Sequence, residues 1–371
     1  RVVDEDGESV DWIELRNAGN SLLSTQGYTL SDNRNEPGKW SLPDVKLTPG
    51  AYLLVFASGK DRSDPGAELH AGFSLTSSPG YLALGNPDGA TTASVFEYPR
   101  QFYGMSFGVG GYFATPTPGT PNGPVDFTGF VRDTSFSVDR GFYEDPFRVE
   151  IATRTEGASI YYTTDATVPS PANGTLYTGP VLIETTTVLR AVATKPGLVS
   201  SNVDTQTYIF LADVIRQPAA PPGVPATWGV DNSVAQGATN LPRPADYEMD
   251  SGIIAQFGEQ AVRDALRHHP TISIVMDPDD LWNESRDPAI GGIYPNPYGG
   301  TGNQFVPGQG EPRDWERPAS AEFMGFPKVP GRQVNCGIRI GGNYARHPNR
   351  YKHHLRLTFR RQYGAGRLRA P

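Results

Sequence analysis

The sequence predicts a mainly β protein, in which sandwich-type domains are followed by a C-terminal α+β region. Its apolar stretches are short, and many alternate with period two, which is typical of half-buried strands. Gly and Pro, at 42 and 34 residues, supply many turns, while 17 Phe, 17 Tyr and 5 Trp supply bulk for packed cores. A chain of 371 residues is too long for one core and predicts two or three domains.

Composition argues against several classes of protein. The isoelectric point near 5.3 disfavours general affinity for nucleic acid. No apolar run approaches the length of a membrane span. Cys336 is the only cysteine, so no internal disulfide can form. The strand pattern around Cys336 places it on a core face, where it acts as a small apolar residue rather than a nucleophile.

Residues 1–122 are expected to form the first β-sandwich. Residues 11–15 alternate in polarity, residues 51–56 form a nearly continuous apolar strand, and residues 81–84 form another. Asn86, Pro87, Asp88 and Gly89 have the composition of a tight turn. The Pro- and Gly-rich residues 116–123 end the domain as a linker.

Several motifs in this segment resemble those of bacterial lamin-tail domains, which implies an immunoglobulin-like sandwich. They are residues 11–15 with Asn17, residues 28–32, Trp40, residues 52–56, residues 80–84 and residues 116–119. The first strand of that family would precede Arg1. Asp11, Glu14 and Asp32 could suggest a cation site, but exposed carboxylates at strand edges and turns are the better interpretation.

Residues 125–210 are expected to form a second β-sandwich, with strands at 147–151, 159–163, 187–193 and 205–210. Residues 160–165 with Pro169, residues 177–180 and residues 185–191 are similar to the chitobiase/β-hexosaminidase C-terminal-type domain. That resemblance implies an immunoglobulin-like accessory domain of the kind found beside enzymes. Tyr161 and Tyr162 could stack on sugars, but neighbours in a strand face opposite ways, so one of them belongs to the core.

Residues 211–270 are expected to be a Pro-rich linker followed by a helix. Residues 217–225 are extended, residues 226–250 are irregular, and Pro242 and Pro244 prevent a helix there. Residues 259–269 have helical spacing, and Pro270 ends the helix. Two histidines, His268 and His269, fall at its C-terminus, where a cation is favourable.

Residues 271–371 begin the third domain with a buried-type strand at 271–276. Asp277, Asp279 and Asp280 follow it, and they suit the capped first turn of a short helix better than a metal site. A strand at 315–323 carries Ala319, Ala321 and Phe323 on one face, with Ser320 and Glu322 on the other.

The last forty residues are strongly basic, with nine Arg, one Lys and no acid, although the whole chain has a net charge of -8. Residues 334–340 and 351–359 alternate with period two and are expected to pair. The first strand then places Arg339, and the second places Lys352, Arg356 and Arg360, away from the core. Like charges facing each other across a ladder are destabilising, so we expect an anion there, phosphate above all. The alternative is that these cations pair with acids in a part of the protein expected to follow Pro371.

From Thr271 onward, the order of motifs resembles the start of a CotH-type (spore-coat protein H) kinase domain. The matching residues are 272–282, 292–294, 315–318 with Glu322, 335–340, Arg346, Pro348, Lys352, 355–357, 359–360 and 363–364. Members of that family are atypical protein kinases that use ATP and a divalent metal, Mg or Mn, to phosphorylate protein serines. The resemblance implies that Lys352 contacts phosphate, with Arg339 and Arg346 as lesser candidates. Glu322 is the expected partner carboxylate of Lys352. His353 and His354 depart from the family pattern.

The resemblance places the catalytic base and metal-binding aspartates of the kinase after Pro371, so the fragment is expected to be inactive and to bind nucleotide weakly or not at all. The sequence thus predicts two immunoglobulin-like sandwiches and an incomplete α+β kinase-like domain in an extracellular or envelope protein. Its partner would be a protein substrate or a cell-surface or polysaccharide partner, without nucleic acid or a membrane span in this fragment. One alternative is a non-catalytic adhesion or scaffold protein that binds polysaccharide or protein. Another is a glycosidase, for which no convincing carboxylate pair is found.

Overall fold

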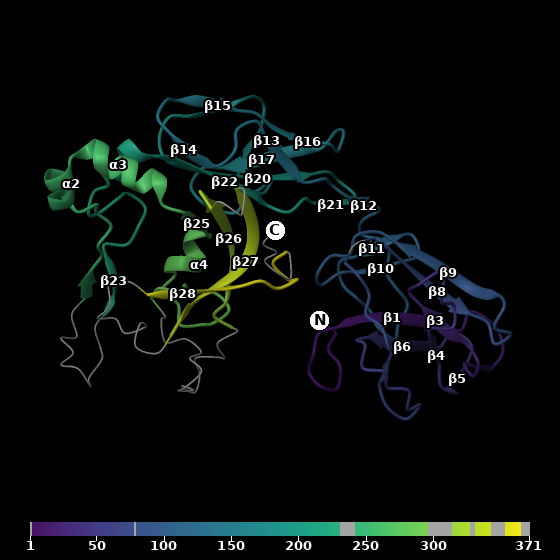
Figure 1. The fold of residues 1–371 in the computed structure, drawn as a ribbon. Coiled ribbons are helices and arrows are strands. Elements are labelled where there is room, and N and C mark those ends of the chain that lie inside the picture. The colour runs from purple at the N-terminus through teal and green to yellow at the C-terminus, as the bar shows by residue number, and fades with distance from the viewer. Residues whose placement is uncertain are drawn as a thin grey trace, which may run out of the picture. The chain divides into compact units, whose positions relative to one another are not determined.

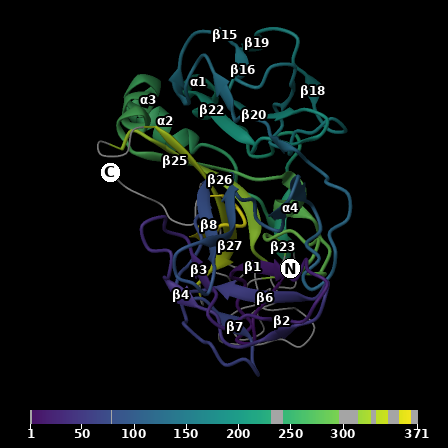
Figure 2. The ribbon, with the colours of Figure 1, turned by 90° about the vertical axis from the view of Figure 1, so that its right-hand side faces the viewer.

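The computed structural model describes residues 2–77, 79–230, 242–295, 314–326, 331–342 and 353–364. The chain divides into two compact units, Arg1–Gly129 and Phe130–Pro371. Each unit is described by itself below (Figure 1; Figure 2).

The first unit is built almost entirely of strands. A three-stranded sheet has the order β1-β6-β7, a four-stranded sheet has the order β4-β3-β8-β9, and β2-β5 and β10-β11 form pairs. Only β6 and β7 run parallel among these ladders. The bounds are β1 Asp11–Arg16, β2 Leu23–Ser24, β3 Thr29–Ser31, β4 Trp40–Ser41, β5 Lys46–Leu47, β6 Tyr52–Ala57, β7 Leu69–His70, β8 Gly80–Gly85, β9 Thr92–Tyr98, β10 Ser106–Gly108 and β11 Gly111–Phe113.

One apolar cluster joins the two larger sheets of this unit into a β-sandwich. Ile13 of β1 and Val55 of β6 meet Leu30 of β3 and Trp40 of β4 in that cluster. The alternation predicted for residues 11–15 places Ile13 inward, where it is 5% exposed. The predicted first sandwich is therefore confirmed at the level of its architecture.

The second unit begins with another β-sandwich. Its main sheet has the order β14-β22-β20-β17-β18, and β12-β21, β13-β16 and β15-β19 form pairs. The bounds are β12 Gly129–Phe130, β13 Thr134–Phe136, β14 Gly141–Tyr143, β15 Phe147–Val149, β16 Ile151–Thr153, β17 Ser159–Thr163, β18 Thr175–Leu176, β19 Val181–Ile183, β20 Thr187–Thr194, β21 Leu198–Val199 and β22 Asp204–Phe210. Its core contains Leu189 and Tyr208, both fully buried, and Tyr162 packs against it, as expected for one of the two adjacent tyrosines.

The remainder of the second unit combines helices with an antiparallel sheet of order β25-β26-β27-β28. In Figures 1 and 2, β26 and β27 lie beside β22 of the sandwich, and the two strands have contacts with it. The bounds are α1 Leu211–Val214, β23 Thr227–Val230, β24 Pro242–Pro244, α2 Ser251–Phe257, α3 Glu259–His268, β25 Thr271–Val275, α4 Pro278–Trp282, β26 Arg317–Met324, β27 Arg332–Gly341 and β28 His354–Thr358.

The predicted elements of this region are largely confirmed. Helix α3 ends at His268, whose ring Nδ1 donates to the Asp264 carbonyl 2.6 Å away, which supports its role at the helix terminus. Cys336 is fully buried on the apolar face of β27, and burial raises the pKa of its thiol to about 11. Such a thiol is not a nucleophile at neutral pH.

Two expectations are wrong. Residues 226–250 are not wholly irregular, because β23 and β24 pair there with a register shift, and prolines are tolerated in such a short edge ladder. The alternation of residues 351–359 also predicts that Leu355 points to a core together with Leu357 and Phe359, but Leu355 is 41% exposed. It lies in the edge strand β28, where Leu357 but not Leu355 packs against the described core.

Candidate functional site

The sheet of β25–β28 has one apolar and one polar face, as its period-two pattern predicts. The apolar face carries Ala319, Ala321, Cys336, Ile338 and Ile340, which pack with the buried Ile293. The opposite face carries Ser273, Ser320, Glu322, Gln333, Asn335, Arg339 and Arg356 at alternate register positions. The candidate site residues Glu322 and Arg339 both lie on this polar face, together with Arg356.

Glu322 lies at the β25–β26 end of the polar face and is fully buried. Its Oε1 accepts a hydrogen bond from the Thr207 backbone N–H at 3.1 Å, and its Oε2 accepts one from the Thr207 hydroxyl. The Arg140 Nε lies 3.4 Å from Oε1. Burial raises the pKa of the Glu322 carboxyl, because solvation of the charged form is lost. Glu322 therefore ties the third region to β22 of the sandwich.

The predicted pairing of Glu322 with Lys352 stays a prediction. Lys352 and Arg346 lie outside the described residues. The structure instead gives Glu322 a set of partners from the sandwich, together with Ser273, whose hydroxyl lies 2.8 Å from that of Thr207. We call Glu322, Thr207, Ser273 and Arg140 the seam cluster.

Arg339 and Arg356 lie at the other end of the polar face. They are directly opposite each other in the antiparallel register of β27 and β28. Arg339 is half-buried and Arg356 is exposed. The register therefore places these two arginines on one face, as predicted, whereas Lys352, the third member of the predicted basic surface, lies outside the described residues. Like charges at facing positions destabilise a ladder unless an anion or acid neutralises them.

Glu316 neutralises Arg360, one of the predicted cations. The sequence analysis did not identify this pairing. Its Oε1 lies 3.2 Å from the Nε of Arg360, and its side chain is 2% exposed. Glu316 and Tyr363 both crowd Gly337, where a Cβ would come within 2.3 Å of the Tyr363 ring. Burial raises the pKa of Tyr363 to about 12. Part of the basic tail is thus paired within the given chain, with an acid that neither interpretation of the tail anticipated.

The acidic run after β25 has the predicted structural role. Asp277 caps α4 by accepting from the Asp279 N–H at 3.0 Å. Its other oxygen accepts from the Val168 N–H of the sandwich at 3.1 Å. Asp280 lies 3.4 Å from the guanidinium Nε of the buried Arg317. Through these contacts, the carboxylates of Asp277 and Asp280 stabilise the fold.

The acids of the first unit are paired with the protein's own groups. Asp32 binds Lys39 at 2.6 Å, and Glu14 accepts from the Gly119 N–H at 2.6 Å. A cluster that the sequence did not reveal surrounds Lys60, whose Nζ lies 2.6 Å from Asp4, 2.6 Å from Asp6 and 3.0 Å from Glu8. These carboxylates raise the pKa of Lys60. The ammonium group of Lys60 therefore already occupies the position between these carboxylates that a cation would take.

Comparison with known proteins identifies one part of the chain. Residues 138–205 match the family model of the chitobiase/beta-hexosaminidase C-terminal domain. This match falls within the second sandwich and supports the resemblance stated for it. No curated protein matches the chain. Within the described ranges, no helix is both long enough and apolar enough to cross a membrane.

Proposed function

We propose that the polar face of β27 and β28 holds the phosphates of ATP in a kinase-like domain of the CotH type. The observation that carries this proposal is the pair of arginines, Arg339 and Arg356, at facing register positions. A polyphosphate placed between them would convert their repulsion into two charge-assisted interactions. Arg356 has no ion pair with a carboxylate among the described residues, whereas Arg360, which follows β28, is paired with Glu316.

The donor set suits a polyphosphate better than a bare metal ion. Both acids described on or beside this face, Glu316 and Glu322, already contact arginines. A Mg or Mn ion would therefore need carboxylates from residues other than these. When bound, the ion would neutralise phosphate charge as the γ-phosphoryl group moves to a serine hydroxyl. We propose Lys352 as a further contact to the phosphates and Arg346 as a lesser candidate for the same role.

The two sandwiches are proposed as accessory modules of an extracellular or envelope protein. The family match at residues 138–205 supports this location, because such domains accompany secreted glycosidases. A protein serine is the proposed substrate. The burial of Glu322 against β22 suggests that the second sandwich also supports the kinase-like sheet mechanically.

The test is binding of Mg·ATP by the full-length gene product, measured by calorimetry. We expect Lys352→Ala to abolish binding and Arg356→Gln to weaken it about tenfold or more, since one charged hydrogen bond is lost. Arg154→Gln is the matched control, because Arg154 is also exposed in the second unit but lies in the sandwich. Unchanged binding in both Lys352→Ala and Arg356→Gln would remove β27 and β28 from the nucleotide site.

A non-catalytic scaffold is the second candidate, and the internal Glu316–Arg360 pair favours it by showing that tail cations can serve the fold. The same preparation distinguishes the two. Transfer of radiolabelled phosphate from ATP to serine in a protein acceptor supports the kinase. Absence of both nucleotide binding and transfer supports the scaffold.

A further inference from the structure

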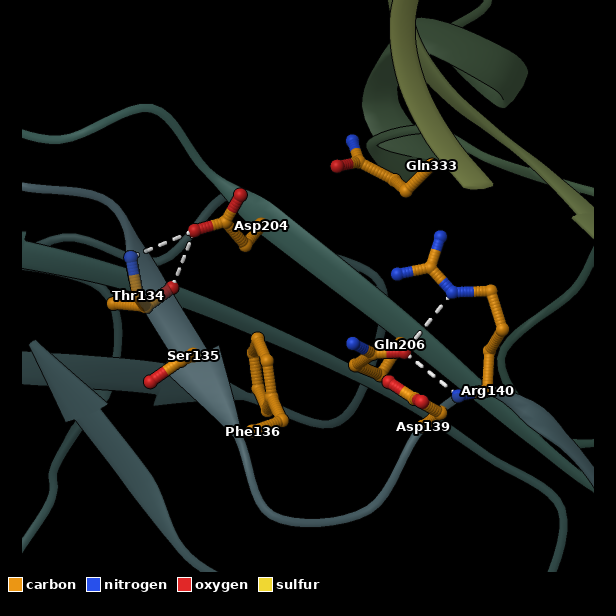
Figure 3. Close-up of a pocket in the computed structure, with 8 residues that line it drawn as sticks. All are labelled: Thr134, Ser135, Phe136, Asp139, Arg140, Asp204, Gln206 and Gln333. Carbon is orange, nitrogen blue, oxygen red and sulfur yellow. Dashed lines mark hydrogen bonds between the residues drawn. The ribbon is translucent and has the colours of Figure 1, made fainter. Parts of the chain in front are cut away.

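Next to the seam cluster, a polar pocket of about 250 Å³ is lined by charged side chains that have partners within the protein (Figure 3). The Asp204 carboxylate accepts from the backbone and the hydroxyl of Thr134, at 2.8 and 2.6 Å. The Nε of Arg140 donates to Gln206 at 3.1 Å. The arrangement around β7 of the first unit is different, because two carboxylates and a buried imidazole converge there.

Three potential metal ligands meet at this place: Glu5 from the segment before β1, and Glu68 and His70 at β7. One ligand atom of each lies within 4.8 Å of the other two. Side chains two residues apart in an extended strand share a face, so Glu68 and His70 point the same way, while Leu69 between them packs in the core. The backbone N–H of Glu5 donates to Glu68 at 2.7 Å, which brings the segment before β1 against β7.

His70 is the most rigidly placed of the three ligands. Its side chain is fully buried, and its Nε2 lies 2.8 Å from Glu5 Oε2. Apart from that carboxylate, Nε2 has no hydrogen-bond partner in the described part of the chain. The other ring nitrogen, Nδ1, lies 2.9 Å from the Ser58 hydroxyl. A metal at Nε2 requires the ring proton on Nδ1, where the Ser58 oxygen can accept it, and such an outer hydrogen bond is the usual support of a metal-binding histidine.

The two carboxylates have less positive charge beside them than they need. Arg62 binds Glu5 Oε1, but it is shared with Asp6, whose carboxylate lies 2.9 Å away. Lys60 is surrounded by three other carboxylates. Glu68 has no ion pair with a lysine or arginine in the part of the chain that the structure describes. Two carboxylates that share one site repel each other unless a cation or a proton lies between them.

The donor atoms select the class of cation. An imidazole nitrogen and carboxylate oxygens are ligands that Zn²⁺ and similar divalent transition metals use, and water can complete the coordination. Ca²⁺ and Mg²⁺ prefer oxygen ligands alone, so the buried imidazole disfavours them. Glu68 is exposed, which leaves this side of the cluster open to the ion and to water.

We propose that Glu5, Glu68 and His70 bind one Zn²⁺ ion or a similar divalent transition metal. The ion places positive charge between the two carboxylates and takes the position between His70 Nε2 and Glu5 Oε2. It thereby ties the segment before β1 to β7. The site lies within the first unit and is independent of the nucleotide proposal.

Nitrogen-15 NMR of the full chain, stripped of metal with a chelator, tests this site because it observes each of the 6 imidazoles separately. We expect Zn²⁺ to shift the Nε2 resonance of His70, and Ca²⁺ and Mg²⁺ at the same concentration to leave it unchanged. Titration of this resonance gives the affinity. Glu68→Gln and Glu5→Gln should each weaken the binding about tenfold or more, since loss of an outer hydrogen bond alone can cost that much.

Glu8→Gln is the matched control, because Glu8 lies in the same segment but contacts Lys60 instead of the proposed site. It should leave Zn²⁺ binding at His70 unchanged. Circular dichroism confirms that each variant is folded. The proposal is overturned if Zn²⁺ shifts only the other imidazoles, if Ca²⁺ or Mg²⁺ shifts the His70 resonance equally, or if folded Glu68→Gln and Glu5→Gln proteins bind Zn²⁺ like the parent.

Discussion

The two ends of the polar face of the β25–β28 sheet differ in how their charged side chains are arranged. At the β25–β26 end, Glu322 is fully buried and its oxygens are held by Thr207, with Arg140 3.4 Å away. At the β27–β28 end, Arg339 and Arg356 face each other, and Arg356 is exposed. The first end carries its own counter-groups and holds the fold together. The second places two arginines at facing positions, one of them exposed, and it is where we propose an anionic ligand.

The largest expected effect comes from removing the carboxylate at the structural end. Glu322→Ala leaves Arg140 buried beside an empty space, and breaking a buried pair costs about 3–5 kcal/mol of unfolding free energy. Chemical denaturation of the chain measures this loss. Glu284→Ala, at an exposed position, should change stability by less than about 0.5 kcal/mol. A Glu322→Ala protein as stable as the Glu284→Ala control would show that the seam cluster does not stabilise the fold.

A smaller loss is expected at Thr207, and β22 offers its own control. Thr207→Val removes the hydroxyl that binds Glu322, at a cost of about 1–3 kcal/mol. Thr205 lies two residues earlier and is equally buried, but its hydroxyl has no partner in the described part of the chain. Thr205→Val should therefore be neutral or stabilising. Equal denaturation midpoints for the two variants would contradict the assignment of Thr207 to the seam.

The pH dependence of stability isolates the Glu322 carboxyl. Burial raises its pKa above the ordinary value of 4.5, so the folded protein keeps this proton to higher pH than the unfolded chain does. The stability that it contributes is complete below about pH 4.5 and is lost as pH rises through the folded-state pKa. Relative to Glu322→Gln, the parent protein should lose stability upward from that pH and then level off. A constant difference across denaturation curves from pH 4 to 8 would contradict the raised pKa.

The smallest expected effect lies at the other end. Without a ligand, Arg356→Gln should relieve repulsion with Arg339 and stabilise the protein by about 0.2–1 kcal/mol. The gain should shrink as salt is added, because exposed charges are screened. Thermal unfolding at low and high ionic strength measures both. A loss of stability in Arg356→Gln would mean that Arg356 is paired within the protein.

The period-two pattern was enough to predict β26 to β28 and to place Arg339 and Arg356 on one face, because strand geometry alone fixes which side chains share a face. The apolar run at 271–276 predicted β25. Capping preferences likewise predicted the role of Asp277 at α4. The partner of Glu322 could not be predicted in this way, since Thr207 lies 115 residues away and the contact depends on tertiary packing. Glu316 was visible in the sequence, but nothing local indicated that it would be buried against Arg360.

Hydrogen–deuterium exchange of the full-length gene product with and without Mg·ATP compares the two ends directly. Amides of β27 and β28 around Arg339 and Arg356 should exchange more slowly when nucleotide is present, while those of β22 around Thr207 should not change. Unchanged exchange in β27 and β28 under saturating nucleotide, or protection confined to β22 and β26, would contradict the proposed phosphate site.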